Sequence, residues 1–241
     1  MGKQIELQLR IPESINDITL EQYQRYAKVA NGIEEETEES LHFLNLKALE
    51  IFCDLQLKES YDIPMHLFDD VLERLGEVIS EKTPLAKRFW FRGNNGVEVE
   101  FGMHPSLHDM TSGEYFDLDK YINSFDDMHK AMAVLYRPIT KHHKDLYDIE
   151  EYQGTAKYAE HMKYMPAGIA IAARLFFYRL GMKLSKHTIH SSLQALDKEE
   201  RLRVESKFLE KNGVGINQFM HSLEEMSRNL TRLPSSISTH A

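Results

Sequence analysis

The side chains best suited to chemistry in this chain are its 12 histidines, several of which are close neighbours in the sequence. The three closest pairs are His104 with His108, His142 with His143, and His187 with His190. On a helix, a spacing of three or four residues places two imidazoles on one face, as a shared metal ion requires. Pro105 disfavours a helix through the first pair, and the motif His-Glu-x-x-His does not occur. We therefore expect histidines at the surface or at interfaces, and we assign no metal site.

Neighbouring carboxylates are the next candidates, because two of them can work as acid and base. Asp117/Asp119 and Asp126/Asp127 are such pairs, although Asp126 is explained more simply as a helix cap. The one cysteine, Cys53, lies in an apolar segment without an obvious neighbouring base, so we expect a buried thiol. The sequence contains neither a phosphate-binding glycine loop nor a Gly-x-Ser-x-Gly elbow. We predict no catalytic residue and no cofactor.

Charge and length narrow the class of protein. The chain has 241 residues, enough for one large domain or two small ones, and its net charge is −9. An acidic protein is a poor general binder of DNA or RNA, and a single cysteine excludes an internal disulfide. The most apolar stretch, 165–182, contains two arginines and is short for a membrane span. The N-terminus lacks the apolar run of a secretory signal, so we expect a cytoplasmic protein without nucleic-acid or membrane partners.

Helical patterns dominate the first 80 residues. Thr19 to Gln22 forms a capping box, which predicts a helix that continues to about Ala30. Apolar residues at helical spacing predict further helices over 40–55 and 65–80, and the glutamate-rich run between Glu34 and Glu39 is typical of a solvated loop.

Two segments alternate between polar and apolar residues, as half-buried strands do. The clearer one is a hairpin, with strands at 88–92 and 97–101 around an Asn-Gly turn at 93–96. Phe89 and Phe91 then share one face and Trp90 occupies the other. Residues 5–9 also alternate, and we expect this N-terminal strand to pair near the hairpin, because a lone hairpin is only marginally stable.

From residue 111 onward the patterns predict helices only. Thr111 or Ser112 caps a helix through Tyr121, and Asp126 caps a second helix, Met128 to Tyr136, which Pro138 terminates. A basic exposed loop over 141–144 follows. The remaining helices are expected at 154–164, from Pro166 to Lys183, at 197–211 and at 216–230.

The sequence therefore predicts an α+β fold that is mostly helical. A small N-terminal antiparallel sheet with the hairpin is followed by a helical, bundle-like C-terminal part. We divide the chain into a mixed α/β part at 1–105, a helical part at 106–232 and a flexible tail at 233–241. The sequence shows no linker between the first two parts, and whether they share one core stays open.

Two motifs carry a resemblance to a known family. They are Gly113-Glu114-Tyr115 and Leu135-Tyr136-Arg137-Pro138, within the runs 110–122 and 127–139. These runs, and the opening segment 11–24, resemble small tail-baseplate proteins of contractile-tailed, T-even-type bacteriophages. The resemblance covers most of residues 5–180, and residues 185–241 have no counterpart in it.

The motif residues also have a physical interpretation. Glu114 lies in the first turn of its helix, where the macrodipole favours an anion, and Phe116, Leu118 and Tyr121 are expected to provide apolar contacts. Arg137 is expected at the C-terminal end of the next helix, where a cation is favoured. A suitable partner for Arg137 is an acid such as Glu114 or Asp117.

The resemblance implies a non-enzymatic structural or assembly protein of the phage tail or baseplate hub. Its partners would be tail or baseplate-hub proteins, with self-association left open. It would act in the host cytoplasm during assembly, and whether it stays in the virion is also open. One alternative is a transient tail-assembly chaperone, and the other is a metal-dependent enzyme that uses the histidines.

Overall fold

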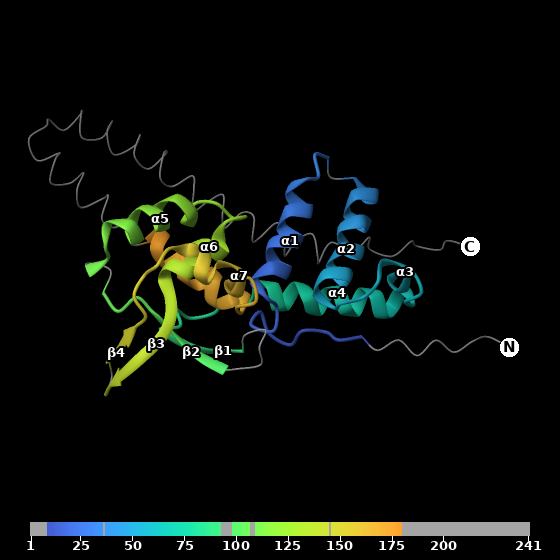
Figure 1. Ribbon diagram of the computed structural model, residues 1–241. Helices are drawn as coiled ribbons and strands as arrows, with labels where there is room; N and C mark the ends of the chain where they lie inside the picture. The colour runs from blue at the N-terminus through green and yellow to red at the C-terminus, as the bar shows by residue number, and fades with distance from the viewer. Residues whose placement is uncertain (1–8, 36, 93–97, 107–108, 145, 180–241) are drawn as a thin grey trace, which may run out of the picture.

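The computed structural model describes residues 9–35, 37–92, 98–106, 109–144 and 146–179, and within these ranges it combines helices with a four-stranded antiparallel sheet. The helices that precede the sheet are α1 (Leu20–Asn31), α2 (Glu38–Phe52), α3 (Leu57–Ser60) and α4 (Met65–Ser80). The strands are β1 (Arg88–Arg92), β2 (Glu98–Met103), β3 (Tyr136–His143) and β4 (Leu146–Ile149). The other helices are α5 (Ser112–Ile122), α6 (Met128–Leu135), η2 (Thr155–Lys157), α7 (Ala159–Met162) and a helix at 167–179. Figure 1 shows α1–α4 beside the part that contains the sheet.

Local capping determines where the first helices begin. At α1 the Gln22 amide donates to the Thr19 hydroxyl over 3.2 Å, while the Thr19 amide donates to the Gln22 side chain over 2.9 Å. Thr37 and Ser40 form the same reciprocal pair at the start of α2, directly after the acidic run. The helices predicted at 19–30, 40–55 and 65–80 are confirmed, except that the second begins at Glu38 and ends at Phe52.

A first apolar cluster fills the space between α1, α2 and α4. Tyr23, Leu49 and Leu72 are among its members, and all three are fully buried. Cys53 belongs to this cluster, and burial raises the pKa of its thiol to about 12. The expectation of a buried thiol is confirmed, and Cys53 stays protonated at neutral pH.

The predicted hairpin is also confirmed. β1 and β2 pair antiparallel with Phe89 opposite Phe101, and the turn at 93–97 lies outside the described residues. Phe89 and Phe91 are 9% and 7% exposed, whereas Trp90 is 66% exposed. Alternate side chains of a strand point to opposite faces, so β1 presents phenylalanines to the core and tryptophan to solvent.

The predicted fold class is wrong in the position of the sheet. The strands run in the order β1-β2-β3-β4 and occupy the middle of the chain, from residue 88 to residue 149, rather than its N-terminus. The neighbour of the hairpin is β3, and residues 9–12 have no strand conformation; residues 1–8 lie outside the described part. Strands β3 and β4 thus arise within the segment that was expected to contain helices alone.

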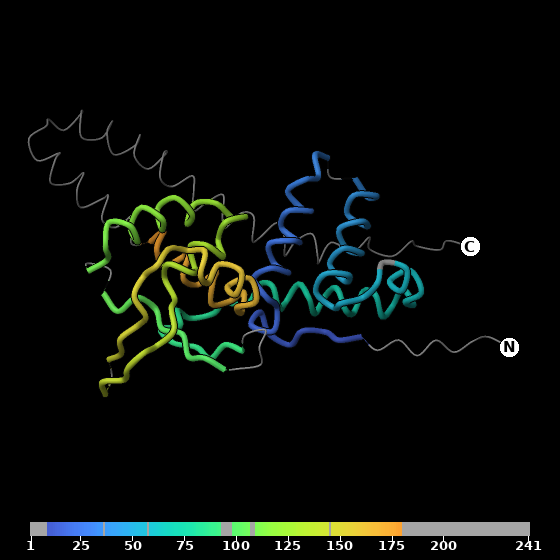
Figure 2. Tube along the Cα trace, in the orientation of Figure 1, coloured from blue at the N-terminus to red at the C-terminus, as the bar shows by residue number. Residues whose placement is uncertain are grey.

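The cause of this error lies at the end of α6. The chain leaves the helix at Leu135, and Tyr136 adopts an extended conformation that leads directly into β3 (Figure 2). Met103 lies opposite Tyr136, and Gly102 opposite Arg137. The open edge of β2 offers backbone hydrogen bonds to this segment, which local polarity does not reveal. Arg137 is therefore a strand residue, and the predicted position at a helix C-terminus is wrong.

The basic segment 141–144 was expected to be a loop. Residues 141–143 instead belong to β3 and pair with β4, where Tyr147 lies opposite His142 and Leu146 opposite His143. Their side chains are exposed, as expected, because this end of the sheet extends away from the core.

A second apolar cluster lies between the inner face of the sheet, α6 and the helix at 167–179. Its fully buried members include Met132, Leu135 and Met162, together with Ala170 and Ala173. The small side chains of Ala170 and Ala173 let the helix at 167–179 pack closely. Backbone hydrogen bonds also join α1 to the segment before the helix at 167–179. One of them runs from the Leu20 amide to the Met165 carbonyl over 2.8 Å.

Other predicted boundaries need adjustment. Asp127, and not Asp126, is the N-cap of α6; its carboxylate accepts from the Ser124 hydroxyl and pairs with Lys130. The helix expected at 154–164 is two short pieces, η2 and α7, after a left-handed Gly154. The predicted helices at 197–211 and 216–230, the tail at 233–241, and residues 180–183 lie outside the described residues.

Among the described helices there is no candidate for a membrane span, since none combines the necessary length with the necessary hydropathy.

Candidate functional site

Glu114 begins the candidate site, because it caps α5 and is buried at the same time. One carboxylate oxygen, Oε2, accepts from the Thr111 amide over 2.7 Å and from the Thr111 hydroxyl over 2.8 Å. The Glu114 amide donates to the Thr111 hydroxyl, which completes a capping box. Glu114 and Leu118, four residues apart, are the two buried residues of α5 and direct this face of the helix inward.

The other carboxylate oxygen pairs with Arg137 of β3. Arg137 Nη2 lies 2.5 Å from Glu114 Oε1, and each residue is 3% exposed. The two resemblance motifs therefore meet in a buried ion pair between residues that are 23 positions apart in the sequence. Glu114 was one of the two acids considered for Arg137, and this pairing is confirmed.

Electrostatics keeps the Glu114 carboxylate ionised. Burial by itself raises the pKa of Glu114, but the hydrogen bonds from Thr111 and the charge of Arg137 outweigh it and lower the pKa below its usual value. A charge buried at this depth is stable only with such partners, so Thr111 and Arg137 act together on one carboxylate.

His104 lies beside the ion pair, in the segment that follows β2. Its Nε2 is 3.6 Å from Glu114 Oε1, which is longer than a hydrogen bond. Burial lowers the pKa of His104, opposed by Glu114 and assisted by Arg137, so the imidazole is neutral at pH 7. The contact between His104 and Glu114 is thus one of packing, not of opposite charges.

Tyr152 covers the other side of Arg137. The guanidinium carbon lies 5.5 Å from the centre of the Tyr152 ring, within the range of a cation–π contact. The Tyr152 hydroxyl donates to Asp117 Oδ2 over 2.5 Å, and burial together with this bond raises the pKa of Tyr152. Asp117 is one turn beyond Glu114, so α5 is joined to the chain after β4 as well as to β3.

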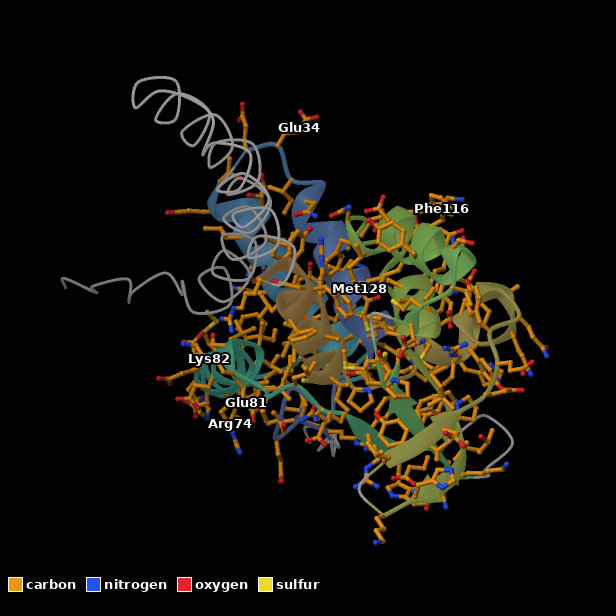
Figure 3. The ribbon with its side chains drawn as sticks, turned by 90° about the vertical axis from the view of Figure 1, so that its left-hand side faces the viewer. Glu34, Arg74, Glu81, Lys82, Phe116 and Met128 are labelled. Carbon is orange, nitrogen blue, oxygen red and sulfur yellow. The ribbon has the colours of Figure 1, made fainter. Side chains whose placement is uncertain are left out.

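The opposite side of α5 is aromatic and exposed. Tyr115 and Phe116 are 60% and 69% exposed, and their rings meet edge to face with centroids 6.1 Å apart. Figure 3 shows Phe116 on the surface of α5 and Met128 in the interior. Phe116 was expected to contact the core; this expectation is wrong, because Phe116 lies two residues from both Glu114 and Leu118 and faces away from them.

The remaining motif residues have structural positions. Leu135 and Tyr136 are fully buried in the second cluster, and the Tyr136 hydroxyl donates to the Ala86 carbonyl over 2.7 Å. The Pro138 carbonyl accepts from the Glu150 amide. Gly113 lies in the exposed first turn of α5, where an added Cβ would meet nothing within 4 Å.

The described histidine candidates of β3 each lie beside a single acid. His142 and His143 are exposed and each lies near one acid, Glu100 at 3.0 Å and Asp148 at 2.9 Å. In the described ranges no three His, Cys, Asp or Glu side chains are grouped as a metal ion requires. His108, His187 and His190 fall outside these ranges.

Sequence reasoning missed His104 as a neighbour of the ion pair, Tyr152 as its cover, and the exposure of Phe116. The period of the helix was an available signal for Phe116, since Glu114 and Leu118 define its buried side. The positions of His104 and Tyr152 depend on the path of the chain after β2 and after β4, and no local sequence pattern indicates that path.

No known protein family, curated protein or solved structure matches the chain.

Proposed function

We propose that this chain is a non-enzymatic structural or assembly component of a contractile phage tail, and that it docks to tail or baseplate-hub proteins through α5. The observation that supports a docking role is the Glu114–Arg137 ion pair, which fixes the buried side of α5 while the rings of Tyr115 and Phe116 on the same helix stay exposed. The phage assignment rests on the resemblance of the two motifs.

The geometry fits docking because α5 is fixed before any partner arrives. Its first turn is capped by Thr111, its buried side is paired with Arg137, and its second turn bonds Tyr152. A rigid helix loses little conformational entropy on association, so most of the energy from burying its rings contributes to affinity.

Tyr115 and Phe116 have the properties of interface anchors. Large aromatic side chains at the centre of an interface typically contribute 2 kcal/mol or more each, roughly a thirtyfold change in affinity. Acidic and basic residues of α5, Asp119 and Lys120, are exposed nearby and supply a polar rim.

The test is co-expression of the full chain with each tail and baseplate protein encoded in the same genome, followed by size-exclusion chromatography. We expect a stable complex with at least one of them, and Tyr115→Ala/Phe116→Ala to weaken it at least tenfold. Tyr61→Ala is the matched control, since Tyr61 is 65% exposed and directly follows α3, away from α5. Absence of any complex, or a complex indifferent to the double substitution, contradicts the proposal.

Quantitative mass spectrometry of purified mature particles distinguishes a retained component from a chaperone. A stoichiometric signal indicates a component of the tail or baseplate. Its absence from particles, combined with a complex in the infected cell, indicates a transient assembly factor.

A further inference from the structure

The outer face of the sheet is a second surface, which is open over β1 and β2, whereas Glu114 of α5 covers its β3 end at Arg137, opposite Gly102. We use this name for the side chains of Arg88, Trp90 and Arg92 on β1, Glu98 and Glu100 on β2, and His142 on β3. The phenylalanines that alternate with them on β1 face the second cluster, whereas Trp90 is 66% exposed. An exposed tryptophan amid charged groups is typical of an interface centre and is costly to leave in water.

Charge on the outer face is arranged in two parallel rows. The β1 row consists of two arginines around Trp90, and the β2 row consists of two glutamates, with Arg92 opposite Glu98 and Trp90 opposite Glu100. The ion pairs between the rows are loose, at 3.7 Å for Arg92–Glu98 and 3.9 Å for Arg88–Glu100. Arg92 and Glu98 stay 71% and 61% exposed, so these groups have capacity for further partners.

The Tyr147 ring occupies the middle of the outer face, where its centroid lies 6.0 Å from the Arg88 guanidinium carbon. Gly102 continues the β2 row opposite Arg88, and Tyr147 of β4 and Ile139 of β3 close over it. The Tyr147 hydroxyl donates to the Lys87 and Met103 carbonyls, which fixes the ring on the sheet. A sheet face with a fixed centre and exposed charges at one side is suited to another sheet face.

We propose that the outer face binds the outer face of a second copy of this chain. A two-fold axis in the plane of the interface, parallel to the strands and between β1 and β2, places the β1 row of each copy on the β2 row of the other. In the register of β1 and β2, Arg92 of each copy then faces Glu98 of the other, and Trp90 faces Glu100. Arg88 faces Gly102 and lies diagonally next to Glu100, so opposite charges are neighbours on both sides of the axis. An axis perpendicular to the strands would place arginine on arginine, so charge selects the first arrangement.

The size of the face implies a weak dimer. Five strand residues span roughly 17 Å and three strands roughly 14 Å, which is smaller than the roughly 800 Å² per partner of a stable interface. We therefore expect association in the micromolar to millimolar range and a clear dependence on salt, because exposed ion pairs are screened.

The decisive experiment is a charge exchange on the full chain, measured by sedimentation equilibrium up to roughly 1 mM, the range relevant to a weak interface. R88E/R92E and E98R/E100R each place like charges across the axis, and we expect each to raise the dissociation constant at least tenfold. A one-to-one mixture of the two restores opposite charges on both sides of the axis and is expected to associate as the unmodified chain does.

Trp90 provides an independent readout, since it is the one tryptophan in the chain. Its emission is expected to shift to the blue with concentration in the unmodified chain and in the mixture, but in neither variant alone. K58E/R74E, which changes the net charge by the same amount at exposed sites on α3 and α4, is the control and should dimerise normally. Circular dichroism confirms that each variant is folded.

Three results overturn the proposal. They are a monomer throughout the concentration range, a dimer that both charge variants form unchanged, and a mixture that stays monomeric. None of them bears on binding through α5, because Tyr115 and Phe116 are unaltered in every variant. Failure of this proposal is thus distinguishable from failure of the proposed tail function.

Discussion

Glu114 and Arg137 are charged residues in a place where charge is expensive. Removing a carboxylate or a guanidinium from water costs several kcal/mol, and mutual attraction offsets this cost only with good geometry and further hydrogen bonds. Here Arg137 and Thr111 occupy both oxygens of Glu114. We therefore infer that the main role of the Glu114–Arg137 ion pair is to position α5 on β3, and not to stabilise the fold.

Arg137→Met is expected to lower the free energy of unfolding by about 3 kcal/mol, because it leaves the Glu114 charge buried without its cation. The double variant Glu114→Leu/Arg137→Met removes both charges and is expected to be more stable than the single variant. Urea denaturation measures both. Arg92→Met, which breaks an exposed pair worth at most about 1 kcal/mol, is the control, and an equal loss there would contradict the prediction.

Two buried histidines predict a dependence of stability on pH. Burial lowers the pKa of His104 and of His129 in the folded chain, so the unfolded chain, with histidine pKa values near 6.5, binds protons first as pH falls. The free energy of unfolding is therefore expected to fall from pH 7 to about pH 5.5, by at most about 1.4 kcal/mol per pH unit for each histidine.

Urea midpoints across this pH range test the dependence. His104→Asn/His129→Asn is expected to flatten the slope, because it removes both buried imidazoles. A slope that survives this double variant would assign the effect to other groups.

At the scale of elements, β2 determines what its neighbours become. It pairs with residues 136–138, where β3 begins, and its Gly102 lets Tyr147 of β4 approach closely. A Cβ at Gly102 would lie 2.4 Å from a ring carbon of Tyr147 and 2.9 Å from Ile139, and the Tyr147 ring is held by two backbone carbonyls. Close packing of this kind leaves no room for an added methyl.

Gly102→Ala is therefore expected to lower the free energy of unfolding by about 1–3 kcal/mol through overpacking. Gly113→Ala is the matched control, because a Cβ there meets nothing and alanine favours a helix by up to about 1 kcal/mol over glycine. Thermal or urea denaturation of both variants gives the comparison. A neutral Gly102→Ala would mean that the Tyr147 ring moves aside at little cost.

At the scale of the whole molecule, Phe125 joins the two apolar clusters. It packs against both, with its ring centroid 5.5 Å from that of Tyr23 and 5.5 Å from the Arg174 guanidinium carbon. Gln24 of α1 donates to the Phe125 carbonyl over 2.7 Å. The segment between α5 and α6 thus connects the apolar cluster of α1, α2 and α4 with the cluster beneath the sheet.

Phe125→Ala is expected to cost about 2 kcal/mol, less than a fully buried phenylalanine, since Phe125 is half-buried. Because the ring serves both clusters, hydrogen exchange is expected to accelerate in α1 and in α6 together. Phe116→Ala, at an exposed ring, should change neither helix. Faster exchange confined to one part would show that the clusters unfold independently of Phe125.

Much of the local structure could be predicted because its causes are local. The capping boxes at Thr19 and Thr111 involve residues three positions apart, and the hairpin shows its faces in the alternation of Phe89, Trp90 and Phe91. The ion pair of the candidate site was only partly accessible: the sequence identified Arg137 and two suitable acids, but the choice between them depends on how α5 lies on β3.

The local and the tertiary features of this chain thus have different physical origins. The sequence by itself determined the helices of the first 80 residues, the hairpin, its faces and the charge on each of them, because capping and side-chain periodicity act over a few residues. Only the tertiary structure decided that residues 136–143 and 146–149 are strands, that the sheet lies in the middle of the chain, and that Arg137 pairs with Glu114 rather than with Asp117. These outcomes depend on backbone partners and burial contributed by distant segments, which no local pattern encodes.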